Sequence, residues 1–202
     1  TDATAIAAGG LHTCAITGRQ LDSRVYCWGL NDRKQVGVSI GGETRVPVQV
    51  AANGLPLIGY TDIGLGIGHT CAMGPSRDPG IQTVMCWGSN RRGQLGIGSS
   101  AVIITVPYRI VRQTSDNNAI WDFVAGSLAV GTSSTCASRD GGSVWCWGYG
   151  PPGHFGSEEL SDFQYSAVEH PGLSDARRLW HGSHHVCAER ASGRVVCWGD
   201  NG

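Results

Sequence analysis

The sequence lacks most of the features that mark a membrane protein or a nucleic-acid-binding protein. Its 202 residues contain a single lysine, Lys34, and 15 basic residues stand against 16 acidic ones, for a net charge of −1. Such a balanced chain has no overall field that attracts nucleic acid or an anionic membrane. No stretch reaches the roughly 18 uninterrupted apolar residues of a membrane-spanning helix. Residues Thr1–Thr4 include no basic segment ahead of an apolar one, so we expect a mature form or an internal piece without a signal peptide.

Motifs of the common enzyme classes are missing as well. There is no Gly-x-Ser-x-Gly elbow, no His-Glu-x-x-His motif, no Walker loop and no carboxylate pair in a recognisable context. The glycines of Gly64–Gly68 do not have the spacing of a dinucleotide-binding fingerprint, and we interpret this segment as a turn leading into a strand. We therefore predict a protein that is not an enzyme, with no catalytic residue and no cofactor.

Glycine, in contrast, is abundant. The chain has 31 glycines, about twice the usual share, and 8 prolines, a composition that favours turns over long helices. The eight cysteines form four pairs along the chain and reveal an internal repeat. The first cysteine of each pair lies within Gly-x-x-x-x-Cys-Ala and recurs every 51 to 65 residues, and the second lies within Val-x-Cys-Trp-Gly. The four pairs are Cys14 with Cys27, Cys71 with Cys86, Cys136 with Cys146, and Cys187 with Cys197.

The shortest units predict how the cysteines pair. Asp140–Gly142 reads as the turn of a hairpin, which sets Ala137 opposite Trp145 and Cys136 opposite Cys146. Directly opposed residues at a non-hydrogen-bonded position have Cα atoms about 4.5 Å apart, within the range of a disulfide. A zinc site is the alternative, but it needs two to four residues between its cysteines, whereas these pairs are separated by 9 to 14.

We therefore predict four disulfides, each within its own hairpin. Persistent disulfides imply an oxidising compartment, so we expect a secreted, extracellular or periplasmic protein.

Each unit is expected to contain few, short strands. One strand enters over Ala5–Ile16 or its equivalents, a hairpin returns through Val-x-Cys-Trp-Gly, and a proline-bearing stretch such as Val46–Val50 or Val106–Val111 suits an edge strand. A short helix over Ser157–Phe163 is a further expectation. Three or four short strands per unit describe a propeller blade. The predicted fold is thus all-β, with about three and a half to four blades over units 1–57, 58–120, 121–172 and a truncated 173–202.

Three further motifs carry a family resemblance. The sequence has His-Thr-Cys-Ala at His12–Ala15 and His69–Ala72, Cys-Trp-Gly-x-Asn at Cys27–Asn31 and Cys86–Asn90, and Gly-Gln-Leu-Gly at Gly93–Gly96, with degraded copies at Lys34–Gly37 and Gly153–Gly156. These motifs resemble the regulator-of-chromosome-condensation repeat, in the cysteine-bearing form of secreted bacterial proteins. The resemblance covers essentially the whole chain.

The resemblance implies a propeller, usually of seven blades closed by strands from both termini. It implies less about function, because relatives range from a nuclear nucleotide-exchange factor to a bacterial β-lactamase inhibitor. The third unit departs from the motif, with Ser134 in place of its histidine and Pro151–Pro152 in the asparagine loop. Since fewer than seven units are present, we expect that the chain is a fragment, that other chains complete the ring, or that the arc caps a larger assembly.

The aromatic and imidazole side chains have structural and functional interpretations. Tryptophan recurs at one position in every unit, which favours packing between sheets: Trp28, Trp87, Trp147 and Trp198. Outside that register, Trp121, Trp145 and Trp180 are candidates for exposed binding residues. Motif histidines His12, His69 and His185 are expected to make a hydrogen bond within each blade. In the cluster His181, His184 and His185 at most two rings converge, so we predict no metal site.

Two basic pairs, Arg33-Lys34 and Arg91-Arg92, occupy equivalent loops and should lie side by side on one rim, either simply solvated or docking an acidic partner. Because the repeats agree in their cores and differ in their loops, we predict a secreted interaction module that binds another protein through its rim loops, with Trp121 and Trp180 as further contacts. One alternative is an architectural subunit of a multi-chain extracellular assembly, and another, by analogy alone, is an enzyme inhibitor. Neither nucleic acid nor a membrane span is expected.

Overall fold

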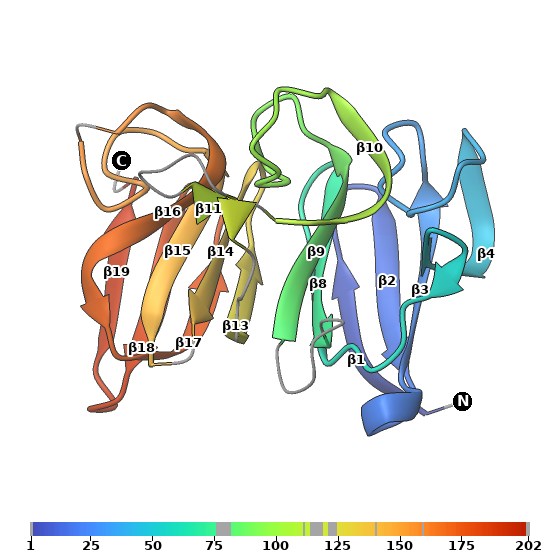
Figure 1. The fold of residues 1–202 in the computed structure, drawn as a ribbon, viewed down its shortest axis with the longest axis horizontal. Helices are drawn as coiled ribbons and strands as arrows, with labels where there is room; N and C mark the ends of the chain where they lie inside the picture. Colours follow the sequence, from blue (N-terminus) through green and yellow to red (C-terminus); the bar gives the residue numbers. More distant parts are fainter. Residues whose placement is uncertain are drawn as a thin grey trace.

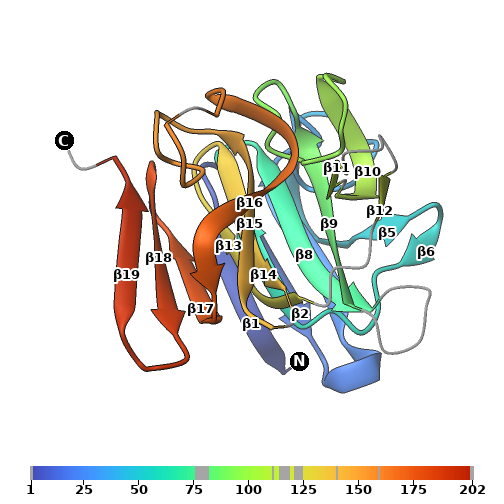
Figure 2. The same cartoon turned by 60° about the vertical axis from the view of Figure 1, so that its left-hand side comes forward.

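Four antiparallel β-sheets stand side by side as the blades of a propeller arc (Figure 1). The computed structural model describes residues 2–75, 82–110, 112–113, 119–120, 125–139, 141–158 and 160–200. Blades 1 to 4 follow one another in chain order, so blade 1 and blade 4 lie at opposite ends of the arc, and the two termini are far apart (Figures 1 and 2). The predicted all-β propeller architecture is confirmed.

Blades 1 and 2 each have four strands in sequential order. Blade 1 contains β1 (Ala3–Ala8), β2 (His12–Thr17), β3 (Arg24–Leu30) and β4 (Glu43–Gln49), with a 3-10 helix, Gln20–Asp22, between β2 and β3. A small ribbon of β5 (Ala51–Ala52) and β6 (Leu55–Pro56) leads to blade 2. Blade 2 contains β7 (Asp62–Leu65), β8 (His69–Pro75), β9 (Gln82–Ser89) and β10 (Ile103–Arg109).

Blade 3 contains β13 (Ala125–Val130), β14 (Ser134–Arg139), β15 (Ser143–Tyr149) and the long β16 (Phe163–Ser174), with β11 (Arg112–Gln113) and β12 (Ala119–Ile120) added beyond β16. Blade 4 contains β17 (Ala176–His181), β18 (His185–Arg190) and β19 (Val195–Gly199). The helix expected over Ser157–Phe163 was wrong: its described residues are turns and bends, and Phe163 already begins β16.

The single entering strand expected over Ala5–Ile16 was also wrong, because it is two strands joined by a turn. The backbone N–H of Gly9 donates to the carbonyl of His12 at 2.9 Å and closes that turn. A Cβ at Gly9 would lie 2.4 Å from the carbonyl oxygen of Gly66 in blade 2, so only glycine fits this close approach. The motif glycine therefore separates the innermost strand from the second strand of each blade.

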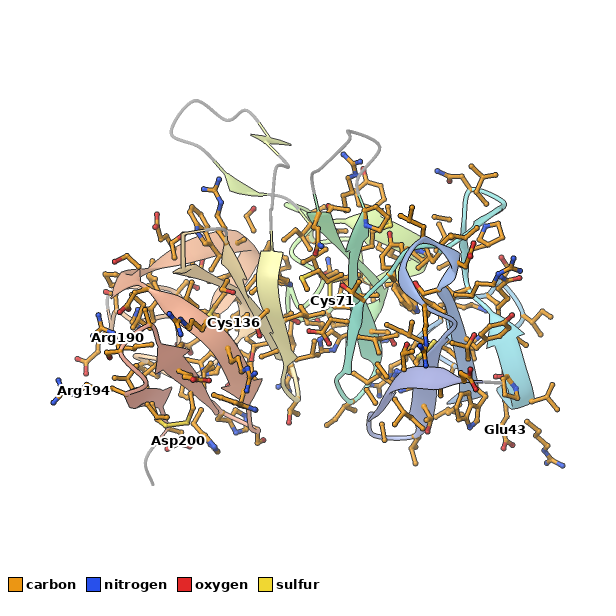
Figure 3. The ribbon with its side chains drawn as sticks, turned by 90° about the horizontal axis from the view of Figure 1, so that it is seen from below. Glu43, Cys71, Cys136, Arg190, Arg194 and Asp200 are labelled. Carbon is orange, nitrogen blue, oxygen red and sulfur yellow. A yellow bond between two sulfur atoms is a disulfide. The ribbon has the colours of Figure 1, made fainter. Side chains whose placement is uncertain are left out.

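The hairpin register agrees with the sequence interpretation. Cys136 pairs with Cys146 and Ala137 with Trp145 across β14 and β15. All four predicted disulfides are present, each with a Cα–Cα distance of 4.1 Å, between Cys14 and Cys27, Cys71 and Cys86, Cys136 and Cys146, and Cys187 and Cys197. Figure 3 shows Cys71 and Cys136 in the interior of the arc, with Glu43 at one end and Asp200 at the other.

The hydrophobic core lies between successive blades rather than inside any one of them. Each of three apolar clusters joins the facing sides of two neighbouring blades, and Trp87 and Trp147 are completely buried in the first and second clusters. This confirms packing between sheets for Trp87 and Trp147, and Trp198 packs against the third cluster, whereas Trp28 is half buried on the open side of blade 1. No helix in the described residues is long and apolar enough to cross a membrane.

Candidate interaction surface

The asparagine and Gly-Gln-Leu-Gly motifs build a compact loop after the third strand of a blade. In blade 1 the Asn31 side-chain oxygen accepts a hydrogen bond from the backbone N–H of Val36 at 3.0 Å, and the Gln35 side-chain oxygen accepts one from Arg33 N–H at 2.8 Å. Blade 2 repeats both bonds, with Asn90 accepting from Leu95 N–H and Gln94 from Arg92 N–H. These motif residues hold the loop's shape and are not themselves available to a partner.

The same loop also ties each blade to the next. The indole N–H of Trp87 in blade 2 donates to the Gln35 carbonyl of blade 1 at 2.9 Å, and Trp147 in blade 3 donates to the Gln94 carbonyl at 3.1 Å. At the third interface, Trp198 donates to the carbonyl of His154 at 3.0 Å. The repeated tryptophan thus fills a core position and satisfies its polar atom across the interface.

The motif histidines link neighbouring blades, so the bond expected within each blade was wrong. His12 Nε2 lies 2.8 Å from the Thr70 hydroxyl of blade 2, and that hydroxyl donates to the Gln35 carbonyl at 2.8 Å. Because the hydroxyl proton is committed to the carbonyl, Nε2 must be the donor to Thr70. His69 lies 3.2 Å from Thr135 in the corresponding arrangement between blades 2 and 3.

These two rings are held neutral. Each leaves a buried Nδ1 atom without a hydrogen-bond partner among the described residues. Burial lowers the pKa of His12 to about 4, and burial together with the nearby His12 and His181 lowers the pKa of His69 to about 3. A second proton at Nδ1 would place a charge where the described residues offer it no acceptor. Both histidines are therefore structural, and neither is a candidate for acid–base catalysis.

The motif histidine of blade 4, His185, is exposed and has no such link to another of the described residues. Within the described residues, no group of three or more His, Cys, Asp or Glu side chains is arranged to hold a metal ion.

One side of the arc, which we call the loop face, carries two sets of segments. They are the loops 31–42, 90–102, 150–158 and 160–162 and the turns 9–11, 66–68, 131–133 and 182–184. Backbone hydrogen bonds join the two sets: Leu30 N–H donates to Leu11 O, and Ser89 N–H donates to Gly68 O. A hollow of about 220 Å³ opens between the turns and is lined by all four blades. Beside it Leu11 and Ile67 are exposed apolar side chains, a feature that the sequence analysis missed because no periodic pattern marks a turn residue.

The predicted basic residues lie on this loop face. The Arg33 side chain extends over Gly68 of blade 2, and the Arg92 guanidinium lies 4.6 Å from the ring centre of Tyr149 in blade 3. Both arginines are exposed, occupy the same motif position and reach onto the following blade. Arg91 is also exposed, while Lys34 adopts a φ of 64° at the glycine position of the motif and donates from Nζ to the Ser39 carbonyl at 2.8 Å.

The tryptophan candidates are not brought together. Trp180 is 49% exposed, but it lies on β17 at the open flank of blade 4, away from the basic residues of blades 1 and 2. Trp145 was wrongly expected to be exposed: it is 7% exposed and packs into the core between blades 2 and 3. Trp121 lies outside the described residues.

Comparison with known proteins agrees with this geometry. Two models of the "Regulator of chromosome condensation (RCC1) repeat" match residues 3–35 and 22–73. The human E3 ubiquitin-protein ligase HERC2 is 27% identical over 95% of this chain, which covers 4% of that protein.

Solved structures show the same fold. The structure of human WBSCR16 has a TM-score of 0.77 at 20% identity, with 98% of this chain and 48% of that chain covered. The Prp20p structure from Saccharomyces cerevisiae has a TM-score of 0.73 at 21% identity, with 97% and 44% covered. The chain therefore spans less than half the length of each of these proteins. Residues 3–73 belong to the regulator of chromosome condensation (RCC1) repeat family, and the described residues form four blades of a β-propeller.

Proposed function

We propose that this chain is a protein-interaction module whose loop face, over blades 1 and 2, docks an acidic partner. The observation that carries the proposal is the juxtaposition of exposed apolar and basic side chains there. Ile67 packs against Gly10, and the next residue, Gly68, lies beneath Arg33. Arg91 and Arg92 extend the positive surface over blade 2. Apolar anchors bordered by arginine are the composition typical of protein-binding surfaces.

Rigidity supports this proposal. The loops that carry the arginines are fixed by side-chain amides and by contacts onto the next blade, as in the Arg92–Tyr149 pair. A surface that is ordered before binding loses less conformational entropy on association. Prp20p, which shares the fold, is a protein for which binding to Gsp1p and histones has been described.

The proposal is tested with polyglutamate, the simplest acidic probe, titrated into the fluorescently labelled chain at low and high salt. We expect salt-sensitive binding that the double variant Arg33→Glu/Arg91→Glu weakens at least tenfold. The matched control is Arg45→Glu/Arg194→Glu, which changes the net charge equally at an edge strand and at the hairpin of blade 4 (Figure 3). Equal loss in both variants would mean that net charge, rather than the loop face, governs binding.

A binding role rather than a catalytic one is part of this proposal. All eight cysteines are in disulfides, so no thiol is available as a nucleophile. We also propose that the protein works in an oxidising compartment, outside the cell or in a periplasm, because four intact disulfides require one. Thiol alkylation of the protein in its native setting, followed by mass spectrometry, tests this: extensive labelling without prior reduction would contradict it.

An architectural role is the second candidate, and it rests on the two open flanks. Ile6 is 70% exposed on blade 1, whereas Ile63, at the same repeat position on blade 2, is 6% exposed. At the other end, Cys187 is partly exposed and Cys197 is exposed, whereas the other six cysteines are completely buried. Both flanks expose positions that every interface inside the arc buries, which favours further blades in contact with them.

A further inference from the structure

The interface between blades 3 and 4 departs from the other two interfaces at several repeat positions at once. At those two interfaces the motif histidine of the earlier blade contacts a threonine of the later one, beside the carbonyl of a loop glutamine. The third interface has a different residue at each of these positions and at the end of the innermost strand: Ser134 for histidine, His154 for glutamine, Val186 for threonine and His181 for an aliphatic residue. Departures from a repeat that cluster in space mark a candidate for a local function.

Three of these side chains converge. Nε2 of His154 lies 2.9 Å and Nε2 of His181 lies 3.1 Å from the same atom, the Ser134 hydroxyl oxygen. The centres of the two imidazole rings are 5.2 Å apart. His154 and Ser134 are completely buried, while His181 is partly buried. Two imidazoles from different blades thus aim the same ring atom at one point in the interface.

The hydrogen atoms at this point are too few for the acceptors. Nδ1 of His154 lies 3.1 Å from the His184 carbonyl, and Nδ1 of His181 lies 2.8 Å from the Gly182 carbonyl. Since a carbonyl only accepts, each Nδ1 carries a proton and each Nε2 of the neutral ring presents a lone pair. Burial lowers the pKa of His181 to about 3 and also lowers the pKa of His154, so both rings are neutral at pH 7. The Ser134 hydroxyl has one hydrogen and can serve only one of the two Nε2 atoms.

An ion that accepts electron pairs would serve both nitrogens. Histidines that bind a metal almost always donate their other ring N–H to a carbonyl or carboxylate, which fixes the ring, and both rings here do so. Imidazole suits copper and zinc, and Cu²⁺ is bound more tightly than Zn²⁺ by a given set of ligands. We propose that Nε2 of His154 and Nε2 of His181 bind a Cu²⁺ or Zn²⁺ ion beside the Ser134 hydroxyl, and that the ion ties blade 3 to blade 4.

This site differs from the one considered in the sequence analysis. That cluster comprised His181, His184 and His185, whereas here His181 pairs with His154, which is distant in the sequence. Structural zinc sites have four protein ligands, so two imidazoles and a hydroxyl predict an exchangeable ion with water completing its coordination. The inference does not depend on binding at the loop face or on further blades, because both ligands lie within this chain.

The test is a titration of the oxidised chain with CuCl₂, followed by electron paramagnetic resonance, which detects nitrogen ligands of Cu²⁺. His184 and His185 are adjacent and partly or fully exposed, so they offer copper a surface site of their own. The reference is therefore the variant His184→Ala/His185→Ala, which retains the His184 backbone carbonyl. We expect this reference to bind one Cu²⁺ ion through two nitrogen ligands, and to bind Zn²⁺ more weakly in competition.

Two substitutions in the reference variant remove one ligand each. His154→Gln and His181→Leu both introduce the side chain that blade 2 has at that position, so we expect the fold to be retained, which thermal melting checks. Each should weaken Cu²⁺ binding roughly tenfold or more, since loss of a hydrogen bond behind a ligand already costs about that much. The control is His170→Gln, which should leave binding unchanged because that ring packs against Trp198 at 4.6 Å.

The melting temperature gives a second measurement. A bound ion stabilises the folded chain, so CuCl₂ should raise the melting temperature of the reference variant and of His170→Gln, but not that of His154→Gln. Loss of the Cu²⁺ signal in the reference variant would overturn the proposal and assign copper to the surface pair. Copper binding that survives both His154→Gln and His181→Leu would overturn it as well.

Discussion

The hydroxyl of Ser134 in blade 3 lies 3.1 Å from Nε2 of His181 in blade 4. Ser134 occupies the position of the motif histidine in blades 1 and 2. Val186 occupies the position of the threonine that this histidine contacts in blades 2 and 3. Both partners of the usual bond are therefore replaced at this one interface. Here the histidine, His181, lies on the later blade and contacts a hydroxyl of the earlier blade. At the other two interfaces the histidine lies on the earlier blade and the hydroxyl on the later one.

His154 completes this arrangement. Its Nε2 lies 2.9 Å from the Ser134 hydroxyl, and its Nδ1 lies 3.1 Å from the His184 carbonyl. Nδ1 of His181 likewise lies 2.8 Å from the Gly182 carbonyl. Since a carbonyl only accepts, both rings carry their proton on Nδ1, whereas His12 carries its proton on Nε2.

We predict that His181→Ala destabilises the fold by about 1–3 kcal/mol, the cost of removing one partner from a partly buried polar contact. The free energy of unfolding from urea denaturation measures it. His185→Ala is the matched control, because His185 is an exposed histidine on the neighbouring strand and should cost little. Equal effects of the two substitutions would contradict a role for His181 at the interface.

Removal of a buried repeat tryptophan should be far more costly than removal of its counterpart at the flank. Trp87→Ala is expected to cost about 3–5 kcal/mol, because it opens a cavity and leaves the Gln35 carbonyl with one donor fewer. Trp28→Ala should cost clearly less, because Trp28 is only half buried at the open side of blade 1. Differential scanning calorimetry measures the stability of the two variants. Similar losses of stability would mean that other protein covers the open side of blade 1.

Stability should fall as the solution becomes acidic. The pKa of His69 is about 3 in the folded chain, well below the ordinary value of 6.5. Between pH 3 and pH 6.5 the unfolded chain therefore binds more protons than the folded chain. The contribution of each such ring is complete above pH 7 and lost as the pH falls through 6.5 toward the folded value. By pH 5 the loss is roughly 2 kcal/mol for each of His12 and His69.

Urea midpoints at pH 7 and pH 5 measure this dependence. His69→Gln keeps a donor near the Nε2 position without a titrating ring, and should reduce the difference between the two pH values. Leu55→Ala, at an exposed position without a titratable group, should leave the difference unchanged. A wild-type midpoint that does not move between pH 7 and pH 5 would show that these rings are not held neutral by burial.

The four disulfides should differ in their access to reductant. A mild phosphine reductant should open Cys187–Cys197 first, because the other three bridges are completely buried. Alkylation followed by peptide mapping identifies the labelled cysteines, and the same treatment in urea should label all eight.

Local features of the structure could be predicted from the sequence, and contacts between distant residues could not. The pairing of Cys136 with Cys146 follows from a short loop and strict alternation along the strands, so the register was confirmed residue by residue. The partner of His12 is 58 residues away on another blade, and nothing in the local pattern points to Thr70.

Two other errors have the same physical origin. The turn at Gly9 was missed because the reason for glycine there is the approach of Gly66 from the next blade. Trp145 looked unusual in sequence because it precedes the repeated Cys-Trp pair, yet it packs between blades 2 and 3. The interaction surface was only half predictable: the motif placed Arg33 and Arg92 on the loops, but only the fold shows that Arg33 lies over Gly68, next to the exposed Ile67.

The confinement of each disulfide to one hairpin bears on how the chain folds as it emerges. Eight cysteines could pair in 105 ways, yet each native partner is 10 to 15 residues away along the chain. Short loops close fastest, so each disulfide can form before the next unit has been synthesised. Oxidation then proceeds blade by blade and leaves few free thiols to mispair. We expect the protein to mature with little need for disulfide reshuffling, even where oxidant is plentiful and isomerase is scarce.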